Sequence, residues 1–178
     1  MADNPKESGS ERRIGWNEYS NLCKLLADRI KQHDDPETVV GIAHGGVIVG
    51  ATVATILGKD FFPIKFSRRV NARVVRKQSK LLVPPTADLE GKSVLLIDDA
   101  SESGQTLKSA IQAIRKRGPS EIITAVLVRS GAYEPQFAAT YFPGRVVFPW
   151  MMDEEEADAQ KKTADTKKKN STKKGKGK

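Results

Sequence analysis

Short apolar runs alternate with amphipathic helical patterns along most of the chain. Near-continuous apolar runs of four to seven residues predict buried strands over residues 39–43, 61–66, 94–97 and 122–128. Between these runs, apolar positions three and four apart predict helices over residues 16–32, 47–57 and 106–117. Short strands that alternate with helices indicate an α/β fold: a single domain with a mostly parallel, twisted sheet and helices on both faces.

The alternation breaks at residues 67–85, between the second and third expected strands. This segment is rich in Lys and Arg, has mixed periodicity and ends on two prolines. Loops of this length in a compact domain are usually functional or disordered. We therefore predict a long mobile excursion at this position, folded as a two-stranded flap.

The length and the charge distribution place a boundary near each end. With 178 residues the chain is long enough for one domain and too short for two. We predict a flexible leader over residues 1–13, the domain over 14–152 and a disordered Lys-rich tail over 153–178. Residues 161–178 hold nine Lys and one Asp, so their charge of 9 − 1 = +8 equals that of the whole chain. The tail is thus a solubilising end or a segment that contacts polyanions without specificity.

The apolar runs are far shorter than the roughly 20 residues that a membrane-spanning helix needs. The polar N-terminus does not resemble a signal peptide. The single cysteine, Cys23, lies in a helical pattern and is expected to be a buried thiol. These observations predict a cytoplasmic protein without membrane contact.

The strongest chemical signal follows the strand predicted over residues 94–97. Asp98 and Asp99 come directly after it, and Gly104 and Thr106 open the next helix. Glycine and the free N–H groups of a helix N-terminus favour a bound phosphate. Two carboxylates would repel a bare anion, so the ligand should also offer hydroxyls or a divalent cation, as a ribose 5-phosphate does. Alternatively, these are solvated acids at an ordinary strand end and helix start.

Two other phosphate-binding motifs are absent. The chain has no Gly-x-x-x-x-Gly-Lys followed by Ser or Thr, so the acidic strand is not that of a P-loop ATPase. Gly41, Gly45, Gly46 and Gly50 do not have the spacing of the dinucleotide-binding fingerprint.

The segment from Val94 to Thr106 resembles the phosphoribosyl-diphosphate signature of type I phosphoribosyltransferases: four apolar residues, two acids, two variable residues, an acid and Thr-Gly-x-Thr. The stretch 41–46 resembles the pyrophosphate loop of that family, and residues 67–85 lie where it has a flexible loop. The stretch 148–150 resembles the closing segment of the purine members, which are xanthine-guanine- or hypoxanthine-like. The resemblance covers roughly residues 16–150.

The resemblance implies a fold with a small hood besides the flap, and transfer of a 5-phosphoribosyl group from 5-phosphoribosyl 1-diphosphate to a nucleobase. A purine base, a salvage role, Mg²⁺ as cofactor, release of pyrophosphate and a homo-oligomer (dimer or tetramer) follow from the same resemblance. Asp99 would hold the metal, and Glu102 would act in catalysis on the base nitrogen. The residues that would bind the donor are Asp98, Asp99, Ala100, Ser101, Ser103, Gly104, Gln105 and Thr106, with His44, Gly45 and Gly46 as the pyrophosphate loop.

Three residues are candidates for contact with the base. Arg129 ends a strand where purine members commonly have Lys, although it could be a solvated strand end. Arg145 lies near the position of a stacking aromatic residue, and a guanidinium is able to stack. Trp150 either contacts the base or packs the hood, and packing is the favoured interpretation.

Four positions depart from the family pattern and keep a second function open. Glu102 and Ser103 replace the usual Asp and Thr, and His44 replaces a frequent Arg or Lys. The fourth is Arg145, near the position of the stacking aromatic residue. A neutral imidazole brings no formal charge to pyrophosphate. The alternative is therefore a non-catalytic regulatory module that binds the ribosyl diphosphate.

Overall fold

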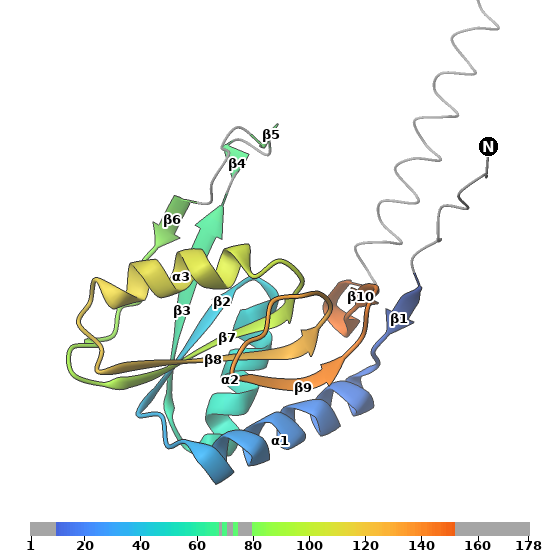
Figure 1. The fold of residues 1–178 in the computed structure, drawn as a ribbon, viewed down its shortest axis with the longest axis horizontal. Coiled ribbons are helices and arrows are strands. Elements are labelled where there is room, and N and C mark those ends of the chain that lie inside the picture. The colour runs from blue at the N-terminus through green and yellow to red at the C-terminus, as the bar shows by residue number, and fades with distance from the viewer. Residues whose placement is uncertain (1–9, 68, 71–72, 75–79, 152–178) are drawn as a thin grey trace, which may run out of the picture.

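Six strands form one sheet in the order β6-β3-β2-β7-β8-β9 (Figure 1). The computed structural model describes residues 10–67, 69–70, 73–74 and 80–151. All neighbouring strands are parallel except β3 and β6. The strands are β2 (Thr38–Ala43), β3 (Asp60–Ser67), β6 (Lys80–Val83), β7 (Ser93–Ser101), β8 (Glu121–Arg129) and β9 (Phe137–Tyr141). The predicted mostly parallel sheet is confirmed.

Helices cover both faces of this sheet, as predicted (Figure 1). On β7, Leu95 and Ile97 pack toward α1 and α2, while the alternate residues Val94 and Leu96 pack toward α3. A strand buried on both faces reads as a continuous apolar run for this reason. The helices are α1 (Trp16–His33), α2 (Gly45–Leu57) and α3 (Gln105–Arg115). Cys23 is fully buried in the core beside α2, as expected.

The chain reverses its direction of progress across the sheet between β2 and β7. From β2 it continues to β3 on one side, and from β7 to β8 and β9 on the other. The segments that follow β2 and β7 therefore leave the carboxyl ends of these two strands in opposite directions. In open α/β sheets a crevice forms at this point and binds the ligand.

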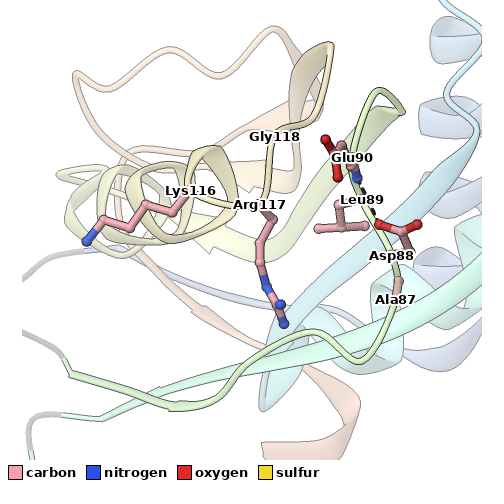
Figure 2. A pocket seen from close by; sticks show the side chains of 7 residues that line it. All are labelled: Ala87, Asp88, Leu89, Glu90, Lys116, Arg117 and Gly118. Atoms are coloured by element: carbon pink, nitrogen blue, oxygen red, sulfur yellow. Dashed lines mark hydrogen bonds between the residues drawn. The ribbon is translucent and has the colours of Figure 1, made fainter.

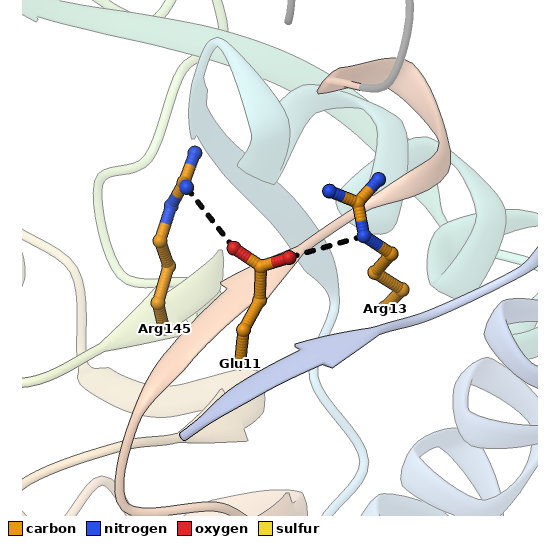
Figure 3. A network of polar contacts seen from close by, with 3 residues as sticks. All are labelled: Glu11, Arg13 and Arg145. Atoms are coloured by element: carbon orange, nitrogen blue, oxygen red, sulfur yellow. Dashed lines mark hydrogen bonds and ion pairs between the residues drawn. The ribbon is translucent and has the colours of Figure 1, made fainter. Parts of the chain in front are cut away.

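A separate two-stranded sheet joins the two ends of the domain. β1 (Glu11–Arg13) runs parallel to β10 (Arg145–Val147), and a short 3₁₀ helix follows at Pro149–Met151. The carboxylate of Glu11 lies between two arginines (Figure 3). Its Oε1 is 3.0 Å from Nε of Arg13, and its Oε2 is 3.1 Å from Nη1 of Arg145.

This small sheet corrects the predicted leader over residues 1–13, because residues 11–13 form β1. The three residues Glu-Arg-Arg have no apolar pattern, and their partner strand lies more than 130 positions later in the sequence. The following residue, Ile14, is fully buried, and its N–H donates to the carbonyl of Val147 at 2.9 Å. The predicted tail over 153–178 lies outside the described residues.

The basic excursion begins and ends as antiparallel structure. β3 pairs with β6, with a register shift between Lys65 and Phe66. Farther out, β4 (Arg69–Val70) pairs with β5 (Arg73–Val74), and in Figure 1 this pair stands away from the sheet. The two-stranded character of the excursion is confirmed in this part, while its mobility remains a prediction.

In the part of the chain that the structure describes, no helix has the length and apolar character required to cross a membrane.

Candidate functional site

The residues that follow β2 contact the carboxyl-terminal half of β7. An added Cβ on Gly46 would lie 2.7 Å from Oδ1 of Asp98 and 2.9 Å from the carbonyl oxygen of Ile97. A Cβ on Gly45 would overlap the carboxylate of Asp99. Only residues without a side chain allow this approach, so Gly45-Gly46 and the two acids form one site. The sequence predicted both motifs, and the structure brings them together.

Asp98 and Asp99 lie within β7, which continues to Ser101 and so extends beyond the strand predicted over residues 94–97. Asp98 is only 8% exposed. Its Oδ1 accepts a hydrogen bond from the Asp99 N–H at 2.9 Å, and Oδ1 of Asp99 accepts one from the Ala100 N–H at 2.8 Å. These bonds restrain both carboxylates, which lie against Gly45 and Gly46.

Burial makes this acidic pair electrostatically unfavourable. Desolvation, and then the neighbouring Asp99 carboxylate, raise the pKa of Asp98 well above its ordinary value. Desolvation also raises the pKa of Asp99. Among the described residues no ion pair joins either carboxylate to a basic side chain. Such a pair, at the carboxyl end of a central parallel strand, marks a candidate functional site.

The Asp98→Asn variant is expected to be more stable than the wild type at pH 7. A carboxyl with a raised folded pKa binds more protons in the folded than in the unfolded protein, so its contribution to the free energy of unfolding falls as pH rises above about 4. Asparagine removes this charge and keeps an oxygen for the Asp99 N–H. Thermal unfolding without ligands from pH 4 to 8 measures the difference. The advantage of the variant should grow with pH, and a constant difference would contradict the assignment.

The carboxylate oxygens of Asp98 and Asp99 are suitable ligands for a magnesium ion that is held jointly with a substrate. Within the described part of the chain, no three His, Cys, Asp or Glu side chains form a cluster that could hold a metal. Mg²⁺ is commonly bound through one or two carboxylates together with substrate phosphates. Asp99, whose carboxylate faces Gly45, and the adjacent Asp98 meet that description.

The loop between β7 and α3 has the features of an anion site. Gly104 is the N-cap of α3 with φ of 69° and ψ of 6°, a left-handed conformation that favours glycine. No side chain caps the helix, and its first turn contains no acid. The first N–H groups of a helix have no partner within the helix and carry its positive end. The side chains of Ser103, Gln105 and Thr106 are exposed at this end.

The start of α2 is a second helix N-terminus whose first N–H groups are available to an anion. The exposed His44 is its N-cap and makes no side-chain capping bond, and the first turn contains no acid. The peptide bond between Ala43 and His44 is cis. The two helix N-termini thus flank the two carboxylates, which suits a ligand with an anionic group at each end and hydroxyls between them.

The segment after β8 supports the loop between β7 and α3, a contact that the sequence pattern did not predict. The Ser130 N–H donates to the Ser101 carbonyl at 2.9 Å, and the Tyr133 N–H donates to the Glu102 carbonyl at 3.3 Å. The ring of Tyr133 lies directly against Gly104. The order of the predicted strands could have indicated this contact, because the segments that follow two neighbouring parallel strands begin at the same edge of the sheet.

The three predicted base contacts have different surroundings. Arg129 forms an ion pair with Glu134, and its guanidinium lies 4.7 Å from the centre of the Tyr141 ring. Arg145 begins β10 and pairs with Glu11 (Figure 3). Their role toward a base stays a prediction.

Trp150 lies in the short 3₁₀ helix after β10 and belongs to an aromatic cluster. Its ring stacks on Phe148 at 4.8 Å between centroids and meets Tyr19 edge-on at 5.5 Å. The exposed Trp16 lies 6.4 Å away. These contacts agree with the favoured interpretation that Trp150 packs the hood.

A cavity of about 400 Å³ lies at the opposite end of β7 and α3 (Figure 2). The guanidinium of Arg117, a lining residue, donates to the Pro85 carbonyl at 2.8 Å, while the Gly91 N–H donates to the Gly118 carbonyl. These bonds tie the end of α3 to the segment before β7. Its lining residues are Ala87, Asp88, Leu89, Glu90, Lys116, Arg117 and Gly118. None of them belongs to the crevice.

Comparison with known proteins places this geometry in context. The sequence matches the family described as Phosphoribosyl transferase domain over residues 15–156. An adenine phosphoribosyltransferase of Thermotoga petrophila is 30% identical over 122 residues, which are 65% of this chain and 69% of that protein. The transcriptional regulator GfcR of Archaeoglobus fulgidus is 29% identical over 127 residues, 67% of this chain and 65% of that protein. The chain thus spans about two thirds of the length of these relatives.

Solved structures show the same fold. The crystal structure of a purine phosphoribosyltransferase from Pyrococcus horikoshii has a TM-score of 0.70 with 25% sequence identity. The match covers 79% of this chain and 93% of that one.

Proposed function

The chain belongs to the phosphoribosyltransferase family, and we propose that it transfers a 5-phosphoribosyl group from 5-phosphoribosyl 1-diphosphate to a purine base in salvage. One observation carries the proposal: Gly45 and Gly46 pack against Asp98 and Asp99 at the reversal point of the sheet. Two anion-favouring helix N-termini flank this contact. A 5-phosphate, two ribose hydroxyls and a pyrophosphate offer matching groups in that order.

Each part of the site has a task in this reaction. The N–H groups at the start of α2 stabilise the charge on the departing pyrophosphate. Asp98 and Asp99 accept hydrogen bonds from the ribose hydroxyls and fix the sugar ring in place. The loop at Gly104 and the start of α3 bind the 5-phosphate.

Proton transfer and charge neutralisation complete the mechanism. Glu102 is exposed at the loop between the acids and α3, where its carboxylate accepts a proton from the attacking base nitrogen. Asp99, together with oxygens of the bound donor, would hold Mg²⁺, which would supply positive charge opposite the diphosphate.

A second candidate function is regulation through donor binding without turnover. It is favoured by the similarity to a protein named as a transcriptional regulator and by His44, which brings no formal charge to pyrophosphate. The sequence also has Glu102 and Ser103 where the family signature has Asp and Thr.

An assay of pyrophosphate release separates the two candidates. The protein is incubated with 5-phosphoribosyl 1-diphosphate, Mg²⁺ and each purine and pyrimidine base in turn. We expect release that depends on a purine base and disappears when EDTA removes the metal. Donor binding by calorimetry without release on any base would instead support the regulatory module. Absence of donor binding would reject both.

A further inference from the structure

We propose that Tyr133 is a positioning residue, which holds the 5-phosphate loop in its binding conformation from outside the site. The inference rests on the proposed function, because it assigns to Tyr133 an effect on the affinity for the phosphosugar. Tyr133 acts through Gly104 and Glu102, which it contacts directly.

The ring of Tyr133 occupies the space beside the Gly104 Cα. The atoms Cγ, Cδ1 and Cδ2 of the ring are the nearest neighbours of a Cβ built on Gly104. Gly104 has φ of 69° and joins the loop to α3. Because glycine has more accessible backbone conformations than other residues, a loop with glycine at its joint needs an external contact to keep a single one. The ring supplies that contact.

The backbone around Tyr133 restrains the other end of the loop. The Tyr133 N–H donates to the Glu102 carbonyl at 3.3 Å. Gly131 approaches the same residue so closely that an added Cβ would lie 2.5 Å from the Glu102 carbonyl oxygen and 3.0 Å from its Cα. Next to it, the Ser130 N–H and hydroxyl both donate to the Ser101 carbonyl, at 2.9 and 3.3 Å.

Tyr133 is itself fixed by rigid parts of the domain. The side chain of Tyr133 packs against the buried cluster between α3 and the sheet, which includes Leu107 and Val126. The ammonium of Lys108 lies over the ring, 5.3 Å from its centre. Lys108 belongs to α3, and its N–H donates to the Gly104 carbonyl at 2.8 Å. The ring, which belongs to the segment after β8, therefore contacts both Lys108 of α3 and Gly104 at the end of the loop.

The loop has few contacts of its own. The side chains of Glu102 and Ser103 are exposed, and no side chain caps α3. Without the ring, the loop would have to become ordered when the phosphate binds. The conformational entropy lost in that step lowers the affinity for the phosphate. The loss should fall on ligands that carry the 5-phosphate. Pyrophosphate, which the segment at His44–Gly46 holds, should bind as before.

Calorimetry with two probes tests this assignment. Ribose 5-phosphate and pyrophosphate, each with Mg²⁺, are titrated into the wild type, Tyr133→Leu and Tyr133→Phe. We expect Tyr133→Leu to weaken ribose 5-phosphate binding about tenfold and to leave pyrophosphate binding unchanged. Tyr133→Phe keeps the ring and should restore wild-type affinity.

A second variant covers the case in which Tyr133→Leu does not fold. Gly131→Ala displaces the Glu102 backbone from the same side and should produce the same selective loss. Equal affinities in the variants and the wild type would overturn the proposal. A loss shared equally by both probes would also overturn it, because a general loss of structure affects both. A wild type that binds neither probe would refute the proposed function itself.

Discussion

Replacing Asp99 with asparagine is expected to lower base-dependent pyrophosphate release about 100-fold, because the variant loses one charged partner of the ribose and the metal. Hydrogen bonds to a charged group contribute about 1.5–3 kcal/mol, and each 1.4 kcal/mol is a factor of ten. Asparagine has nearly the same shape as aspartate. It also retains an oxygen that can accept the hydrogen bond from the Ala100 N–H, which is 2.8 Å long in the wild type. The fold should therefore persist. Initial rates at saturating base over a range of Mg²⁺ concentrations measure the effect.

Asp88→Asn is the matched control for this substitution. Asp88 is an exposed acid before β7, at the other end of the strand, and its Oδ1 accepts a hydrogen bond from the Glu90 N–H at 3.2 Å. Its replacement should leave turnover and the dependence on Mg²⁺ unchanged. Comparable rates for Asp99→Asn and the wild type would reject the assigned role of Asp99.

Replacing Gly46 with alanine is expected to impair both stability and donor binding. The new methyl group would lie within 3 Å of the Asp98 Cα and of the Ile97 carbonyl, which are backbone atoms of the central strand. Overpacking of this kind costs about 1–3 kcal/mol, and each 1 kcal/mol lowers the melting temperature by about 2–4 °C in a domain of this size. The displacement of α2 from β7 would also separate the two binding segments. Thermal unfolding and calorimetry with the donor measure the two effects.

Gly15→Ala adds the same methyl group without a clash. Gly15 is the N-cap of α1, has φ of −83° and has no atom within 4 Å of an added Cβ. This variant should lose at most about 1 kcal/mol of stability and no donor affinity. If Gly46→Ala binds the donor as tightly as Gly15→Ala, the close approach of the two segments is not required for binding.

The acidic pair shows opposing effects of the same residues on stability and function. Burial raises the pKa of both carboxyl groups, so their ionised forms destabilise the folded protein at neutral pH. In the proposed function the same carboxylates, held beside the start of α2, would bind the ribose hydroxyls and a cation. Conversely, a ligand that satisfies them stabilises the folded state.

Local patterns carried much of the fold. The apolar run at 94–97 and the acids after it predicted a strand that ends at the site, and Gly104 predicted the turn into α3. These features depend on residues close together in the sequence, whose side chains alternate or recur at fixed periods. The boundaries shifted by a few residues because hydrogen bonds to neighbouring strands extended β7 to Ser101.

The sequence by itself therefore determined the α/β class, the glycine turn into α3 at Gly104 and the presence of Gly45 and Gly46 after β2. Only the tertiary structure decided what these segments touch. It placed Gly46 against Asp98, Tyr133 against Gly104 and Glu11 between Arg13 and Arg145. Periodicity reports which residues are buried, whereas partners far apart in the chain are chosen by strand order and close packing, which no local pattern encodes.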